Sequence, residues 1–128
     1  NTLALAAFGA AVERMAGPLR MALLGLGAGV AGGLAQWAVA PEALALLIGA
    51  SGLTSGLFGA AVIGMQRLGG AFSRGLLPLI AVWIGVAVIS GQMAAPDGAG
   101  AIAWIAHVGG FLFGLGAAFL LFGRPVRR

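Results

Sequence analysis

The stretch GASGLTSGLFGAAVIGMQR, residues 49–67, carries the two features around which the rest of the chain is organised. Small residues recur at every fourth position of it: Gly52, Gly56, Ala60 and Gly64. They share one face of a helix, and in a membrane such a face lets a second helix approach closely. The same stretch places the hydroxyl of Ser51 where the helix begins. We therefore expect a closely packed membrane helix with a reactive group at one end.

The composition places the chain in a membrane rather than in water. Of the 128 residues, 61% are hydrophobic and 8% are charged, and the mean hydropathy is +1.08. A soluble domain carries about 25% charged residues, so these side chains are too few to cover a water-facing surface. The 24 glycines fit this class because small residues allow close helix packing. We expect an all-α polytopic membrane helical bundle.

Five apolar segments are expected to be helical. They run over residues 1–12, 19–40, 51–67, 75–93 and 101–122. The first ends at Glu13 and Arg14 and is shorter than the roughly 20 residues that a spanning helix needs. We therefore expect it to be the second half of a helix, and the sequence to be an N-terminally truncated fragment. In the second segment, the four-residue spacing of Gly25, Gly29 and Gly33 predicts a close-packing face.

The net charge of +4 comes from arginines, since the chain has no lysine. The arginines fall between segments one and two, between three and four, and after segment five: Arg14, Arg20, Arg67, Arg74, Arg124, Arg127 and Arg128. These positions share one side of the membrane if each segment crosses once, and the positive-inside rule makes that side cytoplasmic. Glu42 and Asp97 fall on the other side. We interpret the charge as a topology signal, not as a nucleic-acid-binding surface. The chain has no cysteine, which leaves no thiolate metal site.

The rise per residue of a helix places Ser51 and His107, the only histidine, at similar depth. Ser51 lies about 24 Å above Arg67, and His107 lies about 26 Å above Arg124. Residues 43–50 must then dip into the membrane. Non-helical backbone is tolerated there only if protein covers it or it lines a wet cavity. We therefore expect a cavity that is open to the non-cytoplasmic side.

The last segment also repeats small residues at four-residue spacing: Ala106, Gly110, Gly114 and Ala118. If this face packs on residues 52–64, a hydrogen bond between Ser51 and His107 is geometrically reasonable. A neutral imidazole can take the proton that makes a serine hydroxyl nucleophilic. No carboxylate is placed to orient the histidine, so the arrangement would be a dyad.

Asn1 can reach the same layer, because it lies about 20 Å above Arg14 by the same rise. Its side-chain amide could donate a hydrogen bond to a developing oxyanion. The backbone N–H of Ser51, at a helix start, could be a second donor.

These polar residues also have structural interpretations. A Gly-x-Ser-Gly string is common, and Ser51 taken alone is more often a helix cap or a packing residue. A lone histidine is often structural, although an ionisable group inside a membrane segment is a functional hypothesis by default. Thr54 and Ser55 are expected to bond to backbone carbonyls of their own helix. Trp83 is expected to face lipid or to pack.

Three groups of residues together resemble the rhomboid family of intramembrane serine proteases. The string Gly49-Ala50-Ser51-Gly52, with Gly56 following, resembles the family's nucleophile motif. The string Ala106-His107-Val108-Gly109-Gly110 resembles its catalytic histidine helix. Asn1 and Glu13 are similar to the end of its second helix and the Glu-containing turn that follows. The resemblance covers essentially the whole chain.

The resemblance implies a rhomboid peptidase domain over residues 1–128, from the second half of helix 2 to helix 6 of a six-helix core. It implies that Ser51 is the nucleophile, His107 the general base and acid, and Asn1 an oxyanion-hole donor. Substrates would be single-pass transmembrane proteins, and the segment at 75–93 would match the lateral substrate gate. No metal, organic cofactor or nucleic acid is implied. The location would be multi-pass in the bacterial inner membrane.

One position departs from the family pattern, and two other functions stay open. Ser55 stands where the family often has an aromatic residue that packs against the histidine, and Phe58, one turn later, is expected to compensate.

One alternative is an inactive rhomboid-like protein that binds membrane clients. The other is a small transporter or channel that uses His107 as a proton-sensitive group, a role that does not require Ser51 at matching depth. The oligomeric state is not indicated.

Overall fold

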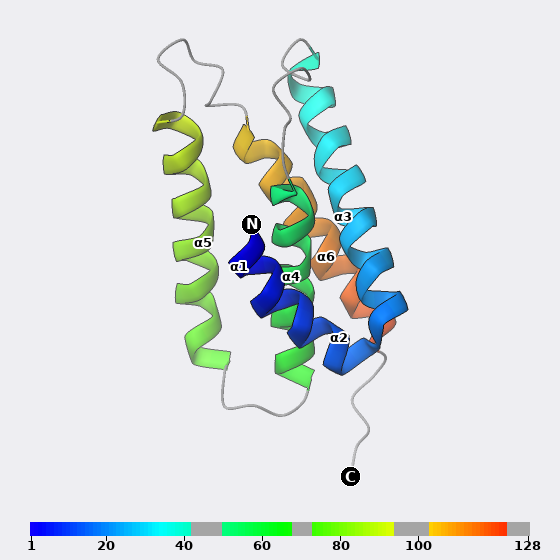
Figure 1. Ribbon diagram of the computed structural model, residues 1–128. Helices are drawn as coiled ribbons and strands as arrows, with labels where there is room; N and C mark the ends of the chain where they lie inside the picture. The colour runs from blue at the N-terminus through cyan, green and yellow to red at the C-terminus, as the bar shows by residue number, and fades with distance from the viewer. Residues whose placement is uncertain (42–49, 68–72, 94–102, 123–128) are drawn as a thin grey trace.

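The computed structural model describes residues 1–41, 50–67, 73–93 and 103–122, and every element in these ranges is helical (Figure 1). The elements are α1 (Thr2–Ala4), the π-helical η1 (Leu5–Gly9), α2 (Ala10–Ala16), α3 (Pro18–Val39), α4 (Ser51–Arg67), α5 (Ser73–Met93) and α6 (Ala103–Leu121). The predicted all-α bundle is confirmed. The bounds of α4 agree with the prediction at both ends, and those of α3, α5 and α6 differ by one or two residues.

The first helical segment is longer than predicted. Elements α1, η1 and α2 form one continuous helical stretch, because the residues that join them have right-handed helical backbone angles. The prediction that Glu13 and Arg14 end it was wrong, since both side chains are exposed and the helix continues to Ala16. Gly17 ends it with a φ of 88°, a conformation that favours glycine. Pro18 then starts α3, where its fixed φ suits the first turn.

Helix α4 is the centre of the bundle, with α3 and α6 packed against it (Figure 1). The predicted contact between the small-residue faces of α4 and α6 is confirmed. A Cβ added at Gly110 would collide with the carbonyl oxygen of Gly52, and one added at Gly114 would collide with that of Gly56. Only glycine lets the two backbones lie this close.

The close-packing face of α3 differs from the predicted one. The buried residues of this helix are Leu24, Gly25, Ala28, Gly32 and Gln36. Gly32 faces α6, because a Cβ there would lie 2.5 Å from the carbonyl oxygen of Ala106. Gly29 and Gly33 are only half-buried. Of the three glycines predicted to form this face, Gly25 is buried there, and Gly29 also lies against α4, since a Cβ at Gly29 would be 3.8 Å from Cβ of Leu53.

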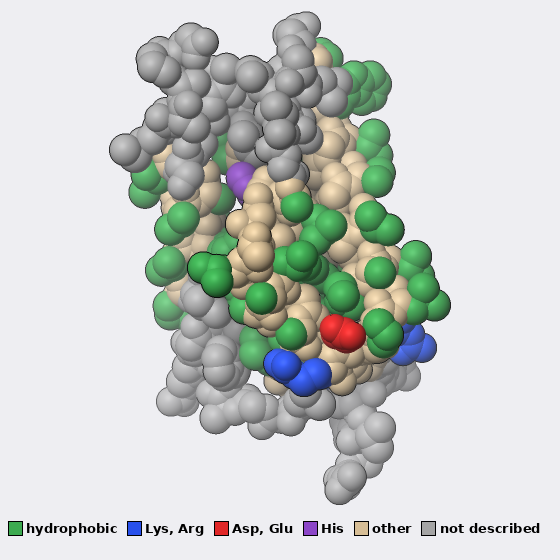
Figure 2. All heavy atoms as spheres, viewed as in Figure 1, with side chains coloured by type: hydrophobic (Ala, Val, Ile, Leu, Met, Phe, Trp, Pro, Cys, Tyr) green, Lys and Arg blue, Asp and Glu red, His purple; other side chains and the backbone are tan. Residues whose placement is uncertain are grey.

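The outer surface of the bundle is apolar, as expected of a membrane protein. Large hydrophobic side chains are exposed along α3, α5 and α6, including Leu26 at 63%, Val82 at 63% and Leu120 at 81% (Figure 2). Monomeric soluble proteins rarely expose contiguous apolar surface of this extent. Within the described residues, Pro18–Val39 and Trp104–Leu121 are long and apolar enough to cross a bilayer. The exposed apolar side chains of these helices are suited to face lipid.

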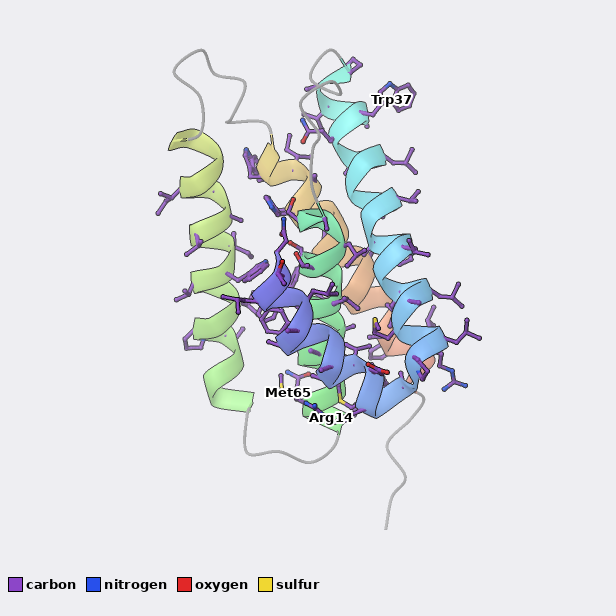
Figure 3. All side chains as sticks on the ribbon, viewed as in Figure 1. Arg14, Trp37 and Met65 are labelled. Carbon is purple, nitrogen blue, oxygen red and sulfur yellow. The ribbon has the colours of Figure 1, made fainter. Side chains whose placement is uncertain are left out.

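The charged side chains of the described residues gather at one end of the bundle (Figure 2). Arg14 and Met65 lie at this end and Trp37 at the other (Figure 3). Arg67 places its guanidinium carbon 4.6 Å from the centre of the exposed Phe119 ring. Arginines at one end and a tryptophan near the other fit a helix bundle between two membrane interfaces.

Helix α5 is joined to the rest of the bundle by aromatic side chains. Trp83 lies 4.9 Å from Phe58 and 5.7 Å from Phe8, ring centre to ring centre. Phe58 also lies 5.7 Å from Phe111, so this aromatic cluster connects η1, α4, α5 and α6. Most of the predicted re-entrant segment (43–50), the acidic residues Glu42 and Asp97, and the C-terminal arginines lie outside the described residues.

Candidate active site

Ser51 is the first residue of α4 and is half-buried. Its neighbour Gly52 packs against α6, where a Cβ at Gly52 would lie 3.4 Å from the carbonyl oxygen of Ala106. Ala106 directly precedes His107 in the sequence. Ser51 and His107 are therefore each one residue away from the same helix–helix contact, at the same level of the bundle. This agrees with the similar depths predicted from the helical rise.

His107 is half-buried on α6 and lines a cavity of about 130 Å³ between α5 and α6. The other lining residues are Trp83, Val86 and Ala87 of α5. The imidazole, purple in Figure 2, is visible from this face of the molecule. Among the described lining residues the walls are mostly apolar, and the polar groups are the histidine and the indole. A side chain of moderate size can therefore sit beside the imidazole.

Asn1 reaches α4 one turn after Ser51. The single proton of the Thr54 hydroxyl faces two acceptor oxygens, the backbone carbonyl oxygen of Ser51 at 3.0 Å and Oδ1 of Asn1 at 3.3 Å, in a shared hydrogen bond. Thr54 is only 1% exposed, whereas Asn1 is exposed. These contacts link the amide of Asn1 to the turn that carries Ser51. The structure thus places Asn1 beside the first turn of α4, which begins at Ser51.

The two hydroxyls that follow Ser51 on α4 differ in their partners. Thr54 bonds to a backbone carbonyl of its own helix, as predicted. The prediction for Ser55 was wrong, because its hydroxyl is fully buried and has no hydrogen-bond partner among the described residues. Phe58, which was expected to replace the aromatic residue at position 55, is fully buried among Phe8, Trp83 and Phe111. The aromatic residue that shares a cavity with His107 is Trp83, from another helix.

Trp83 and the link from Thr54 to Asn1 are the site features that sequence analysis missed. Thr54 lies three residues after Ser51, so its contact with the Ser51 carbonyl could be expected from the sequence. Its other contact, with Asn1, joins residues that are 53 positions apart. Trp83 carries no local signal, since only the packing of α5 brings it beside His107. No group of three or more His, Cys, Asp or Glu side chains occurs in the described ranges.

Comparison with known proteins identifies the family. The sequence model of the Rhomboid domain matches residues 1–124 of this chain. Comparisons with curated proteins and with solved structures gave no match. The match covers nearly the whole chain, including all the helices described above.

Proposed function

Because the chain belongs to the rhomboid family, we propose that it is a serine endopeptidase that cleaves transmembrane proteins within the membrane. The observation that carries this proposal is the contact between Gly52 and Ala106, which sets Ser51 and His107 at one level on touching helices. The exposed apolar surface supports a multi-pass arrangement in the membrane, with the arginine-rich end cytoplasmic. A bacterial inner membrane and single-pass protein substrates belong to the same proposal.

The proposed reaction proceeds in two halves. His107 takes the proton of the Ser51 hydroxyl as its oxygen attacks the scissile carbonyl carbon. The tetrahedral oxyanion is stabilised by the Asn1 amide and by the Ser51 backbone N–H. His107 then gives the proton to the leaving amine as the peptide C–N bond breaks, which leaves an acyl-enzyme on Ser51. Water, deprotonated by the same histidine, hydrolyses the ester and restores the serine.

The cavity beside His107 gives this proposal a place for part of the substrate. It is bounded by Trp83, Val86 and Ala87 on α5, so a substrate side chain that enters it would lie between α5 and α6. Its volume of about 130 Å³ suits one side chain rather than a helix. The mostly apolar wall favours an apolar residue next to the scissile bond.

The test is labelling of the intact protein in detergent with a fluorophosphonate probe, which reacts with activated serines. We expect wild type to be labelled, and Ser51→Ala and His107→Ala not to be. Ser55→Ala, which removes a serine hydroxyl from the same helix, is the matched control and should keep the label. Absence of label on folded wild type would instead support the client-binding alternative, in which Ser55 replaces the family's usual aromatic residue. Label retained by Ser51→Ala would show that the nucleophile is misassigned.

A further inference from the structure

We infer that Thr54 is a positioning residue that holds the side-chain amide of Asn1 in the orientation required of an oxyanion donor. This inference rests on the proposed function. The observation that carries it is the shared hydrogen bond of the Thr54 hydroxyl, whose one proton lies between the Ser51 carbonyl oxygen at 3.0 Å and Asn1 Oδ1 at 3.3 Å.

The bond to Asn1 distinguishes the two ends of the amide. An asparagine side chain has a carbonyl oxygen that only accepts and an NH₂ group that only donates. A half-turn of the amide would exchange the two groups. In the structure Oδ1 faces the Thr54 hydroxyl, and Nδ2 lies at the other end of the amide. The N–H donors are thereby left available for an oxyanion.

The burial of Thr54 makes this bond effective. Thr54 is 1% exposed, so bulk water does not compete for its hydroxyl. This buried hydroxyl on α4 contacts the amide of Asn1 on the neighbouring helical segment and restrains it. Preorganisation of this kind lets a donor stabilise developing charge without reorganising during the reaction.

The bond to the Ser51 carbonyl oxygen ties the same hydroxyl to the turn of the nucleophile. Ser51 and Asn1 belong to different helices, and the Thr54 hydroxyl contacts both residues. A change in the position of the Thr54 side chain would therefore alter the spacing between nucleophile and oxyanion donor. Such spacing affects the transition state more than the binding of the substrate.

The experiment compares the steady-state kinetics of Thr54→Val and Thr54→Ser in the intact, reconstituted protein with a fluorogenic transmembrane substrate. Valine keeps the branched shape and removes the hydroxyl, whereas serine keeps the hydroxyl. We expect Thr54→Val to lower kcat about tenfold, equivalent to about 1.4 kcal/mol, with KM within about twofold of wild type. Thr54→Ser should recover most of kcat. The matched control is Thr2→Val. Thr2 is the only other threonine of the chain, and it is exposed on α1.

A double-mutant cycle separates positioning from a general effect on structure. In an Asn1→Ala background there is no amide to orient, so Thr54→Val should cause no further loss of kcat. An equal loss in both backgrounds would overturn the inference, as would full kcat in Thr54→Val or failure of Thr54→Ser to recover it. If Ser51→Ala stays active, the proposed function itself fails. If Ser51→Ala is inactive while Thr54→Val is fully active, only the role of Thr54 is refuted.

Discussion

The contact between α4 and α6 can be tested by adding a single methyl group at Gly114. This residue is buried, and a Cβ there would collide with the carbonyl oxygen of Gly56 and lie 2.6 Å and 2.7 Å from its carbonyl carbon and Cα. All three atoms belong to the backbone and cannot turn aside. Ordinary contact begins at 3.4 Å, so Gly114→Ala requires the two helices to move apart.

The cost of this movement follows from overpacking. Inserting a methylene-sized group into a well-packed interior typically costs about 1–3 kcal/mol. Alanine is favoured over glycine within a helix by roughly 0.5–1 kcal/mol, which offsets part of that loss. Gly116, two residues further along α6, is exposed and has open space around an added Cβ, so it is the matched control. We expect Gly116→Ala to be neutral or slightly stabilising and Gly114→Ala to be at least about 1 kcal/mol less stable than it.

The assay is reversible unfolding in mixed micelles by titration with sodium dodecyl sulfate, followed by tryptophan fluorescence. The chain contains three tryptophans that can report on the transition. The comparison is between two Gly→Ala variants on one helix, so differences in helix propensity cancel. Equal midpoints for Gly114→Ala and Gly116→Ala would refute the close approach of α4 and α6, and with it the placement of Ser51 and His107 at one level of the bundle.

Two further predictions concern stability. Phe58→Ala, which removes a fully buried ring from the aromatic cluster, should lower the free energy of unfolding by about 3–5 kcal/mol, whereas Leu120→Ala, at an 81% exposed position, should change it little in the same titration. Gly17→Ala should cost roughly 1–3 kcal/mol because of the φ of 88°, although nothing lies within 4 Å of the added Cβ. Gly85→Ala, in an open helical position of α5, should not destabilise the protein, and a loss equal to that of Gly17→Ala would contradict the explanation by backbone strain.

The helices and the α4–α6 contact could be predicted from the sequence because both are set by local periodicity. Small residues at strict four-residue spacing on both helices indicate one crossing geometry, and the collisions at Gly110 and Gly114 agree with it. On α3 the rule held only in part, because this helix packs against two neighbours: Ala28 meets Gly56 of α4, whereas Gly32 meets Ala106 of α6. Burial instead follows spacings of three and four, through Ala28 and Gly32.

The parts of the site that could not be predicted depend on side chains from distant segments. The similar depths of Ser51 and His107 could be predicted by counting the residues between each of them and the arginine at the other end of its segment, Arg67 or Arg124. The bond from Thr54 to Asn1 depends on how the first helical segment leans against α4. The position of Trp83 beside His107 depends on how α5 packs. Neither is encoded in a spacing within one helix.

The polar residues at the core of this bundle also bear on the proposed hydrolysis. In an otherwise apolar chain, Gln36 is 1% exposed and Ser55 is fully buried. Neither Oε1 of Gln36 nor the Ser55 hydroxyl has a hydrogen-bond partner among the described residues. Burying such groups unpaired is costly, and water is the ordinary partner where protein supplies none. Ser55 lies one turn after Ser51 on α4, so a buried polar group without a hydrogen-bond partner among the described residues adjoins the turn of the predicted nucleophile.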